Sequence, residues 1–162
     1  MEKIKWCTQV KGGIELSEPN GNLANGYILK AEESFEMMQK AKGSRDWSVS
    51  TSYYSMYFSL YSVLMKIGVK CEIHACTIEF MKIFLAPYFS PAECKFMADS
   101  LQARVDTQYY VDREVDDKFV NEMLATAPKF LAKCKGIVAN IRESEINAIR
   151  KQIKIISGVK KR

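Results

Sequence analysis

The chain has 162 residues, of which 48% are hydrophobic and 27% are charged. These values are typical of one ordinary globular domain, large enough to fold without a metal or a disulfide. No stretch reaches the roughly 18 consecutive apolar residues of a membrane span, and the N-terminus lacks the apolar run of a signal peptide. We therefore expect a cytoplasmic protein that makes no contact with a membrane.

The five cysteines are scattered along the chain, at Cys7, Cys71, Cys76, Cys94 and Cys134. An odd number at irregular spacing favours reduced, mostly buried thiols in a cytoplasm. Cys71, His74 and Cys76 lie close together in the sequence, but their spacing matches no common zinc pattern. We expect neither a metal nor another cofactor.

The net charge of +5 is concentrated at the C-terminal end. Residues 142–162 contain seven Lys or Arg and two acidic side chains, so this segment alone has a net charge of +5. A basic segment can contact phosphates, but charge runs are more often simply solvated. We expect a solubilising end, with phosphate contact as the alternative.

The N-terminal segment is predicted to be an irregular arm. Residues 1–22 contain Gly12-Gly13 and Pro19-Asn20-Gly21-Asn22, both of which favour turns. The first helix is expected over about residues 23–42, with Asn22 as its N-cap and Gly43 as its stop.

The second helix, about residues 46–67, has more apolar surface than one core can cover. One apolar stripe includes Val49, Tyr53 and Leu60, and serines form another row. A surface helix normally has one apolar stripe. The second stripe therefore predicts a homodimer interface, formed by Tyr54, Phe58, Tyr61 and Met65.

Three or four further helices follow. A short helix is expected over about residues 74–85, and Ser90-Pro91-Ala92-Glu93 is a capping-box start for a helix that continues to about residue 110. Another is expected over about residues 116–141, kinked at Pro128. Ser144 is a possible cap for a last, basic helix.

Strand signals are nearly absent, so the predicted fold is all-α. We expect an antiparallel (up-down) helical bundle of about five helices. The predicted organisation is an N-terminal arm over residues 1–22, the bundle over residues 23–142, and a basic C-terminal helix and tail over residues 143–162.

Two segments carry a family resemblance. The first is Ser52-Tyr53-Tyr54-Ser55-Met56-Tyr57-Phe58, which leads into Gly68-Val69-Lys70-Cys71-Glu72-Ile73-His74; the second is Ala103-Arg104-Val105-Asp106-Thr107-Gln108-Tyr109-Tyr110. Both resemble the HEPN domain family, in its uncharacterised prokaryotic and archaeal branch. The family consists of helical bundles found in toxin–antitoxin and RNA-processing systems. The resemblance covers roughly residues 20–142.

The nuclease members of that family have an arginine and a later histidine that are separated by four to six residues. Arg104 matches the arginine, but the expected histidine positions hold Tyr109, Tyr110 and Val111. Metal-free RNA cleavage needs a base for the 2′-hydroxyl, and a tyrosine with a pKa near ~10 is a poor base at neutral pH. The resemblance therefore implies a protein that binds rather than cleaves.

The candidate site residues follow from this resemblance. Arg104 is expected to hold a phosphate through its planar guanidinium. Gln108, four residues on, shares its helix face, and Tyr110 is the third candidate for binding a nucleotide or phosphate. No residue is assigned as catalytic; the candidates are Arg104, His74 and Tyr109. The structural alternatives are an ion pair for Arg104 and helix entry for His74.

The resemblance implies a nucleotide- or RNA-associated binding subunit, working with a nucleotidyltransferase-type partner in a toxin–antitoxin-like system. The first alternative is a metal-independent ribonuclease toxin that uses Arg104 with His74 or Tyr109. The second is a non-catalytic interaction module. Whether the chain is an enzyme is open, with the missing histidine against it.

Overall fold

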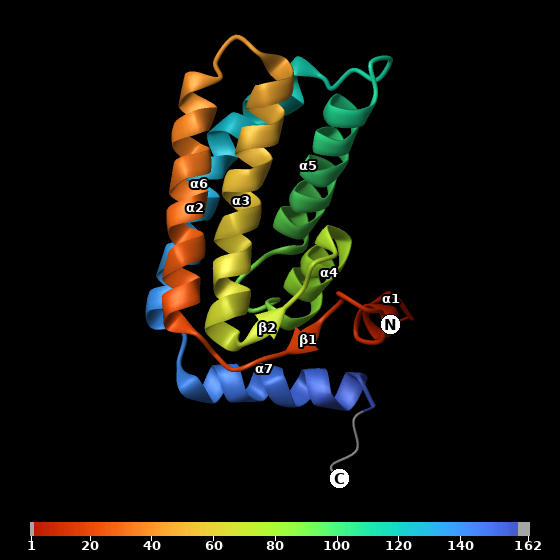
Figure 1. Ribbon diagram of the computed structural model, residues 1–162, viewed down its shortest axis with the longest axis vertical. Helices are drawn as coiled ribbons and strands as arrows, with labels where there is room; N and C mark the ends of the chain where they lie inside the picture. The colour runs from red at the N-terminus through yellow and green to blue at the C-terminus, as the bar shows by residue number, and fades with distance from the viewer. Residues whose placement is uncertain (1, 159–162) are drawn as a thin grey trace.

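The computed structural model describes residues 2–158, which form seven helices and two short strands (Figure 1). In chain order these are α1 (Glu2–Cys7), β1 (Glu15–Leu16), α2 (Gly21–Lys40), α3 (Arg45–Ile67), β2 (Val69–Lys70), α4 (His74–Phe84), α5 (Pro91–Tyr109), α6 (Asp117–Asn140) and α7 (Glu143–Ile156). Among these residues no helix is both long enough and apolar enough to cross a membrane.

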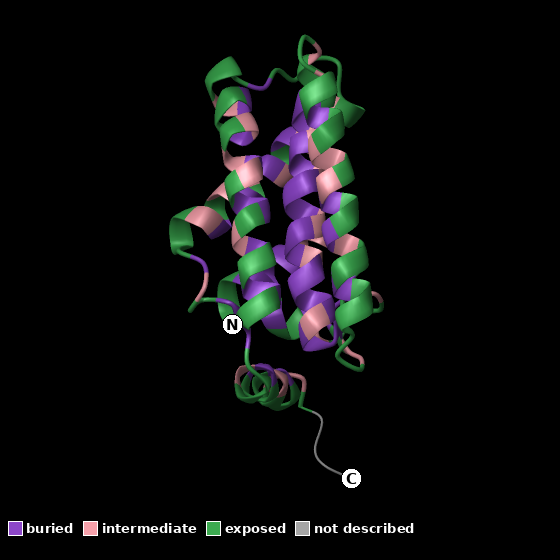
Figure 2. Cartoon of the chain, turned by 90° about the vertical axis from the view of Figure 1, so that its left-hand side faces the viewer, coloured by how far each residue is buried: buried purple, intermediate pink, exposed green. Residues whose placement is uncertain are grey.

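The four long helices α2, α3, α5 and α6 run alternately up and down (Figure 1). This confirms the prediction of an all-α antiparallel bundle. Helix α3 packs against α2, α5 and α6, and Tyr53, Met56 and Leu60 on it have no exposed surface. The buried residues face the interior of the bundle, and exposed residues cover its outer sides (Figure 2). Helix α3 is thus the central element.

The helix ends follow local chemistry, with two differences from expectation. The capping box is confirmed: Ser90 Oγ accepts from the Glu93 amide at 3.2 Å, and Glu93 Oε2 accepts from the Ser90 amide at 2.8 Å. Helix α2 is capped by Asn20 rather than Asn22. Helix α7 begins after Arg142 rather than Ser144. Asn20 Oδ1 accepts from the Leu23 amide at 2.9 Å. At the start of α7, Glu145 Oε2 accepts from the Arg142 amide at 3.0 Å.

The N-terminal arm is more regular than expected. It contains α1, and its strand β1 pairs antiparallel with β2, with Glu15 opposite Lys70. The carbonyl of Gly12 accepts from the amides of Glu72 and Ile73, at 2.8 and 3.2 Å. These bonds hold the arm against the segment that leads into α4.

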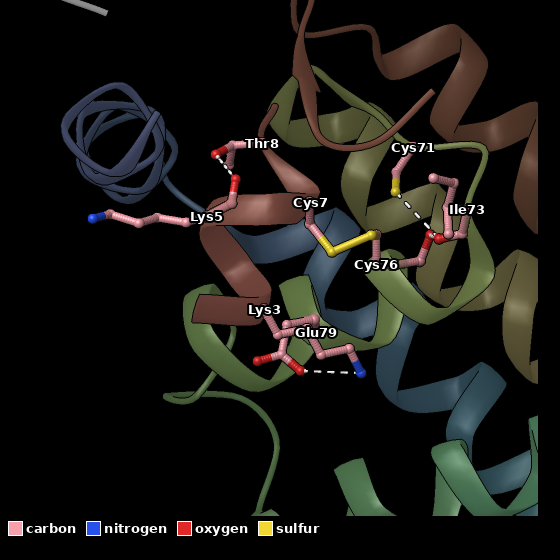
Figure 3. The surroundings of a disulfide bond; sticks show 9 residues. Lys3, Lys5, Cys7, Thr8, Cys71, Ile73, Cys76 and Glu79 are labelled. Atoms are coloured by element: carbon pink, nitrogen blue, oxygen red, sulfur yellow. Dashed lines mark hydrogen bonds and ion pairs between the residues drawn. A yellow bond between two sulfur atoms is a disulfide. The ribbon is translucent and has the colours of Figure 1, made fainter. Parts of the chain in front are cut away.

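A disulfide joins Cys7 of α1 to Cys76 of α4, across 69 residues of sequence (Figure 3). The expectation that all cysteines are reduced thiols is therefore wrong for this pair, because the folded arm brings α1 onto α4. Lys3 and Glu79 form an ion pair at 3.6 Å between the same two helices. Cys71, Cys94 and Cys134 are free and buried.

Helix α7 lies across the end of the bundle instead of along it (Figure 1). Arg150 Nη1 donates to the carbonyls of Ser17, Ile67 and Gly68, at 2.7, 3.1 and 2.9 Å. One of the basic side chains of the C-terminal segment thus serves the fold instead of facing solvent. Lys160, Lys161 and Arg162, which are part of the predicted basic tail, lie outside the described residues.

Candidate functional site

Arg104 lies in the last turns of α5 and is half-buried. Its Nη2 donates to the Tyr54 hydroxyl at 2.7 Å. Its Nε is buried and has no hydrogen-bond partner, which is true of no other buried side-chain nitrogen or oxygen in residues 2–158. The Cζ atom lies 5.3 Å from the centre of the Tyr54 ring and 5.7 Å from that of Tyr109. The guanidinium therefore lies near two aromatic rings, and it makes no ion pair with any of residues 2–158.

His74 is the first residue of α4 and is also half-buried. Its Nδ1 lies 2.7 Å from the Tyr53 hydroxyl. Its ring stacks on Tyr57, with 4.0 Å between the centres and 5° between the planes. Burial, and then the positive charge of Arg104, lowers the pKa of His74 below its usual value. The imidazole is therefore mainly neutral at pH 7.

The hydroxyl that contacts His74 also stays protonated at neutral pH. Burial raises the pKa of Tyr53 well above its usual range. The Tyr53–His74 bond is therefore a bond between two neutral groups. This bond fixes the orientation of the His74 ring. Nδ1 is bonded to the Tyr53 hydroxyl, and Nε2 has no hydrogen-bond partner in the described part of the chain.

Three helices bring these side chains together. We call Tyr53, Tyr54, Tyr57, His74 and Arg104 the Arg–Tyr–His cluster. The Tyr54 ring stands edge-on to His74, at 6.3 Å, and also to Tyr53, at 5.5 Å. Arg104 and His74 are therefore each bonded to the hydroxyl of one of the adjacent tyrosines of α3.

The sequence had placed Tyr53 in the core and Tyr54 at an interface. The structure gives both hydroxyls a polar partner, which apolar periodicity does not reveal. A usable signal was present: three tyrosines within five positions of one helix, in a chain with a single histidine. A buried tyrosine hydroxyl normally finds a partner, so such a group favours a polar site inside the bundle.

A groove of about 580 Å³ runs between α2, α3 and the end of α5. Its walls combine flat aromatic rings with polar side chains, and they are formed by Lys30, Glu33, Ser34, Met37, Asp46, Trp47, Ser50, Thr51, Tyr54, Phe58, Thr107 and Gln108. Gln108 thus lies in the groove. Arg104 does not line the groove, but it bonds to the hydroxyl of Tyr54, which does.

Tyr109 and Tyr110 are exposed, with 65% and 42% of their surface accessible. A regular helix would point Arg104 and Tyr109 about 140° apart, at about 100° per residue. Tyr109 ends α5, however, and its ring comes within 5.7 Å of Arg104. Tyr110 stacks instead on Arg113, whose Cζ is 3.6 Å from the ring centre. The Tyr109 ring thus lies close to Arg104 although the two positions are on different sides of the helix.

The predicted interface stripe is partly covered within the chain. Met65 is only 4% exposed and belongs to the core, so its place on an exposed stripe is wrong. Tyr61 packs on Tyr27 of α2, with ring centres 4.7 Å apart, and its hydroxyl accepts from the Cys71 amide at 3.2 Å. Tyr54 and Phe58 remain half-buried in the groove wall. Helix α2 thus covers part of the aromatic surface of α3 that was predicted to form a dimer interface.

The cysteines near His74 are not free to hold a metal together, since Cys76 is bonded to Cys7. In the part of the chain that the structure describes, no group of three or more His, Cys, Asp or Glu side chains is arranged as a metal site.

Comparison with known proteins agrees with the fold and with the motif positions. The model of the HEPN domain matches residues 24–137, which include α3 to α5 and nearly all of α2 and α6. No curated protein matches the sequence. Since the matched segment covers well over half of the chain and contains Tyr54, His74 and Arg104, this chain belongs to the HEPN domain family.

Proposed function

We propose that this chain is a binding subunit that holds a nucleotide or RNA beside Arg104. It forms a homodimer and acts with a nucleotidyltransferase-type partner in a toxin–antitoxin-like system. The main support is the Arg104 guanidinium, whose Nε has no partner and which adjoins a groove with aromatic walls. Arginine binds phosphate through such donors, and aromatic rings stack on bases. HEPN domains commonly dimerise and bind RNA.

Binding without cleavage is favoured by the residues at the family's histidine positions. Tyr109 and Tyr110 stand there, and a tyrosine is a weak base at neutral pH. Their exposed hydroxyls suit a different role. They can accept a nucleoside monophosphate group that the partner transfers from a nucleoside triphosphate, with release of pyrophosphate.

RNA binding is tested with a labelled single-stranded RNA in EDTA, by fluorescence anisotropy. Arg104→Gln should weaken binding at least about tenfold, the usual size of a lost charge-assisted hydrogen bond. Lys95→Gln is the control, because it also removes one positive charge from α5, but Lys95 pairs with Asp99 and lies outside the groove. Equal affinities for wild type and Arg104→Gln would rule out this site.

The partner is tested by co-expression with a nucleotidyltransferase encoded in an adjacent reading frame. The intact mass should rise by one or more nucleotidyl groups, and the double variant Tyr109→Phe, Tyr110→Phe should lack the addition. An unchanged mass together with no co-purification would remove the nucleotidyltransferase from the proposal.

One observation favours a second candidate, a metal-independent ribonuclease. His74 is held neutral and shares a cluster with Arg104, so it is able to accept a proton. That function requires degradation of single-stranded RNA in EDTA, with loss of activity in both Arg104→Gln and His74→Gln. RNA that stays intact with the wild-type protein excludes it and leaves the binding subunit.

The basic tail is tested by the salt dependence of RNA binding. Deleting residues 157–162 removes Lys160, Lys161 and Arg162. If these side chains contact phosphates, the slope of log affinity against log salt should flatten by about 2–3, since each contact contributes about 0.7–0.9. An unchanged slope identifies the tail as a solubilising end.

A further inference from the structure

The hydrogen-bonding edge of Arg104 is only half used. Nε and Nη2 lie on one edge of the planar guanidinium, and together they donate in parallel to two oxygens of a phosphate. Here Nη2 donates to the single oxygen of the Tyr54 hydroxyl at 2.7 Å, and Nε is buried without a partner. A buried donor without an acceptor is costly and rare. The edge is therefore complementary to a group with two acceptor oxygens. The Tyr54 hydroxyl supplies only one acceptor.

Tyr54 also connects this edge to the groove. Its ring is part of the groove wall, as are Thr107 and Gln108, which lie one turn after Arg104 on α5. Arg104 therefore adjoins the groove through the Tyr54 hydroxyl that it bonds.

The groove itself fits one base better than a chain of phosphates. Its volume of about 580 Å³ is within the usual range for small-molecule sites. Trp47, 66% exposed, offers an aromatic face for stacking, and Phe58 lies in the wall with Lys30 Nζ 5.0 Å from its ring centre. The charged side chains of the wall are Lys30, Glu33 and Asp46, which gives a formal charge of −1. The two carboxylates repel further phosphates and can accept from amino or hydroxyl groups of a nucleoside.

We propose that Tyr54 is a displaceable cap on Arg104, and that one nucleoside monophosphate unit replaces it. The phosphate takes both Nε and Nη2, and the base lies in the groove against Trp47 and Phe58. This inference rests on the proposed function and adds the ligand unit and the residue that controls access to it. A free nucleotide and a residue of an RNA chain both contain this unit.

Tryptophan fluorescence measures the binding directly, because the chain has only Trp6 and Trp47. In the Trp6→Phe background the signal comes from Trp47 in the groove wall. AMP and the dinucleotide ApA should each quench it to saturation, and the tighter of the two identifies the source of the unit. Three control ligands should bind at least about tenfold more weakly than the tighter of AMP and ApA. ATP adds phosphates that the two carboxylates repel. Adenosine lacks the phosphate, and inorganic phosphate lacks the nucleoside.

Two variants in the same background test the cap. Tyr54→Phe keeps the ring but removes the hydroxyl, so no bond to Arg104 must be broken and the Kd for AMP should fall about threefold to tenfold. Arg104→Lys keeps the charge but removes the two-donor edge, and should raise the Kd at least about tenfold. Tyr88→Phe is the control, since its hydroxyl bonds to Glu145 at 2.7 Å, away from the groove. Circular dichroism of each variant checks that it is folded.

The outcomes separate this inference from the proposed function. An unchanged or higher Kd in Tyr54→Phe overturns the cap, even if Arg104→Lys still loses binding. No quenching by AMP or ApA in any variant overturns the ligand unit. In both cases the dependence of RNA affinity on Arg104, measured separately, decides whether the proposed function stands.

Discussion

His74 is the one histidine of the chain, and its surroundings determine its charge. Burial, followed by the charge of Arg104, lowers its pKa in the folded state. Between that lowered value and about 6.5, the unfolded chain binds a proton that the folded chain does not. This contribution to stability is therefore complete above about pH 6.5 and is lost as the pH falls towards the pKa of the folded state.

We predict that the His74 ring titrates below about pH 6.5, the unperturbed value. Its proton NMR signals are unambiguous because no other histidine is present. Arg104→Gln should move the midpoint upwards, since it removes the nearby positive charge, whereas Arg113→Gln should leave it unchanged. A midpoint at or above the unperturbed value, or one insensitive to Arg104, would contradict the observed surroundings of the ring.

At the scale of elements, α7 depends on a single arginine. Arg150 Nη1 bonds to three carbonyls, two of which, Ile67 and Gly68, belong to the end of α3. A cation at a helix C-terminus is favourable because carbonyls there lack partners and carry partial negative charge. Gly68 has a left-handed φ of 82°, and a Cβ at this position would lie 2.5 Å from Arg150 Nη1. The contact between α7 and the end of α3 thus needs both Arg150 and Gly68.

We predict that Arg150→Met lowers the free energy of unfolding by about 2–4 kcal/mol, because it leaves buried carbonyls without their charged donor. Lys151→Met is the control: this neighbouring side chain is exposed, and the change should stay within about 0.5 kcal/mol. Urea denaturation followed by circular dichroism measures both. Equal midpoints for the two variants would show that Arg150 does not hold α7.

At the scale of the whole molecule, the Cys7–Cys76 disulfide joins α1 to α4. A cross-link over a long loop stabilises the fold, mainly by restricting the unfolded chain. We predict that reduction, or Cys7→Ser, lowers the free energy of unfolding by about 2–4 kcal/mol. The Cys7→Ser protein should no longer respond to a reductant. Thiol titration of the denatured, unreduced wild type should find three of the five cysteines; five reactive thiols would contradict the bond.

Assembly is the second prediction at this scale. Two-fold homodimers are the commonest oligomers, and Phe58, half-buried on the α3 stripe, lines the same groove as the exposed Trp47. We predict that Phe58→Asp converts a dimer to a folded monomer. Val111→Asp, at a fully exposed connector position, should remain a dimer. Light scattering measures the mass, and a wild-type monomer at micromolar concentration would refute this prediction.

Local signals in the sequence were reliable where neighbouring residues alone decide the outcome. The box of Ser90 and Glu93 starts α5, and Gly68 ends α3, because caps depend on a few backbone groups within one turn. Caps based on a single residue were less reliable. Asn20 and Asn22 are both able to cap α2, and the path of the arm, which bonds the Asn20 amide to the Met65 carbonyl at 2.9 Å, selects Asn20.

The sequence by itself determined the all-α class, the four long helices and the family, because helical periodicity and the spacing of Tyr54, His74 and Arg104 are properties of the linear chain. Only the tertiary structure decided the pairing of Cys7 with Cys76, the direction of α7 and the contact between Arg104 and Tyr54. Each of these joins segments that are at least 50 residues apart. Their proximity depends on how complete helices pack, and no local pattern encodes that packing.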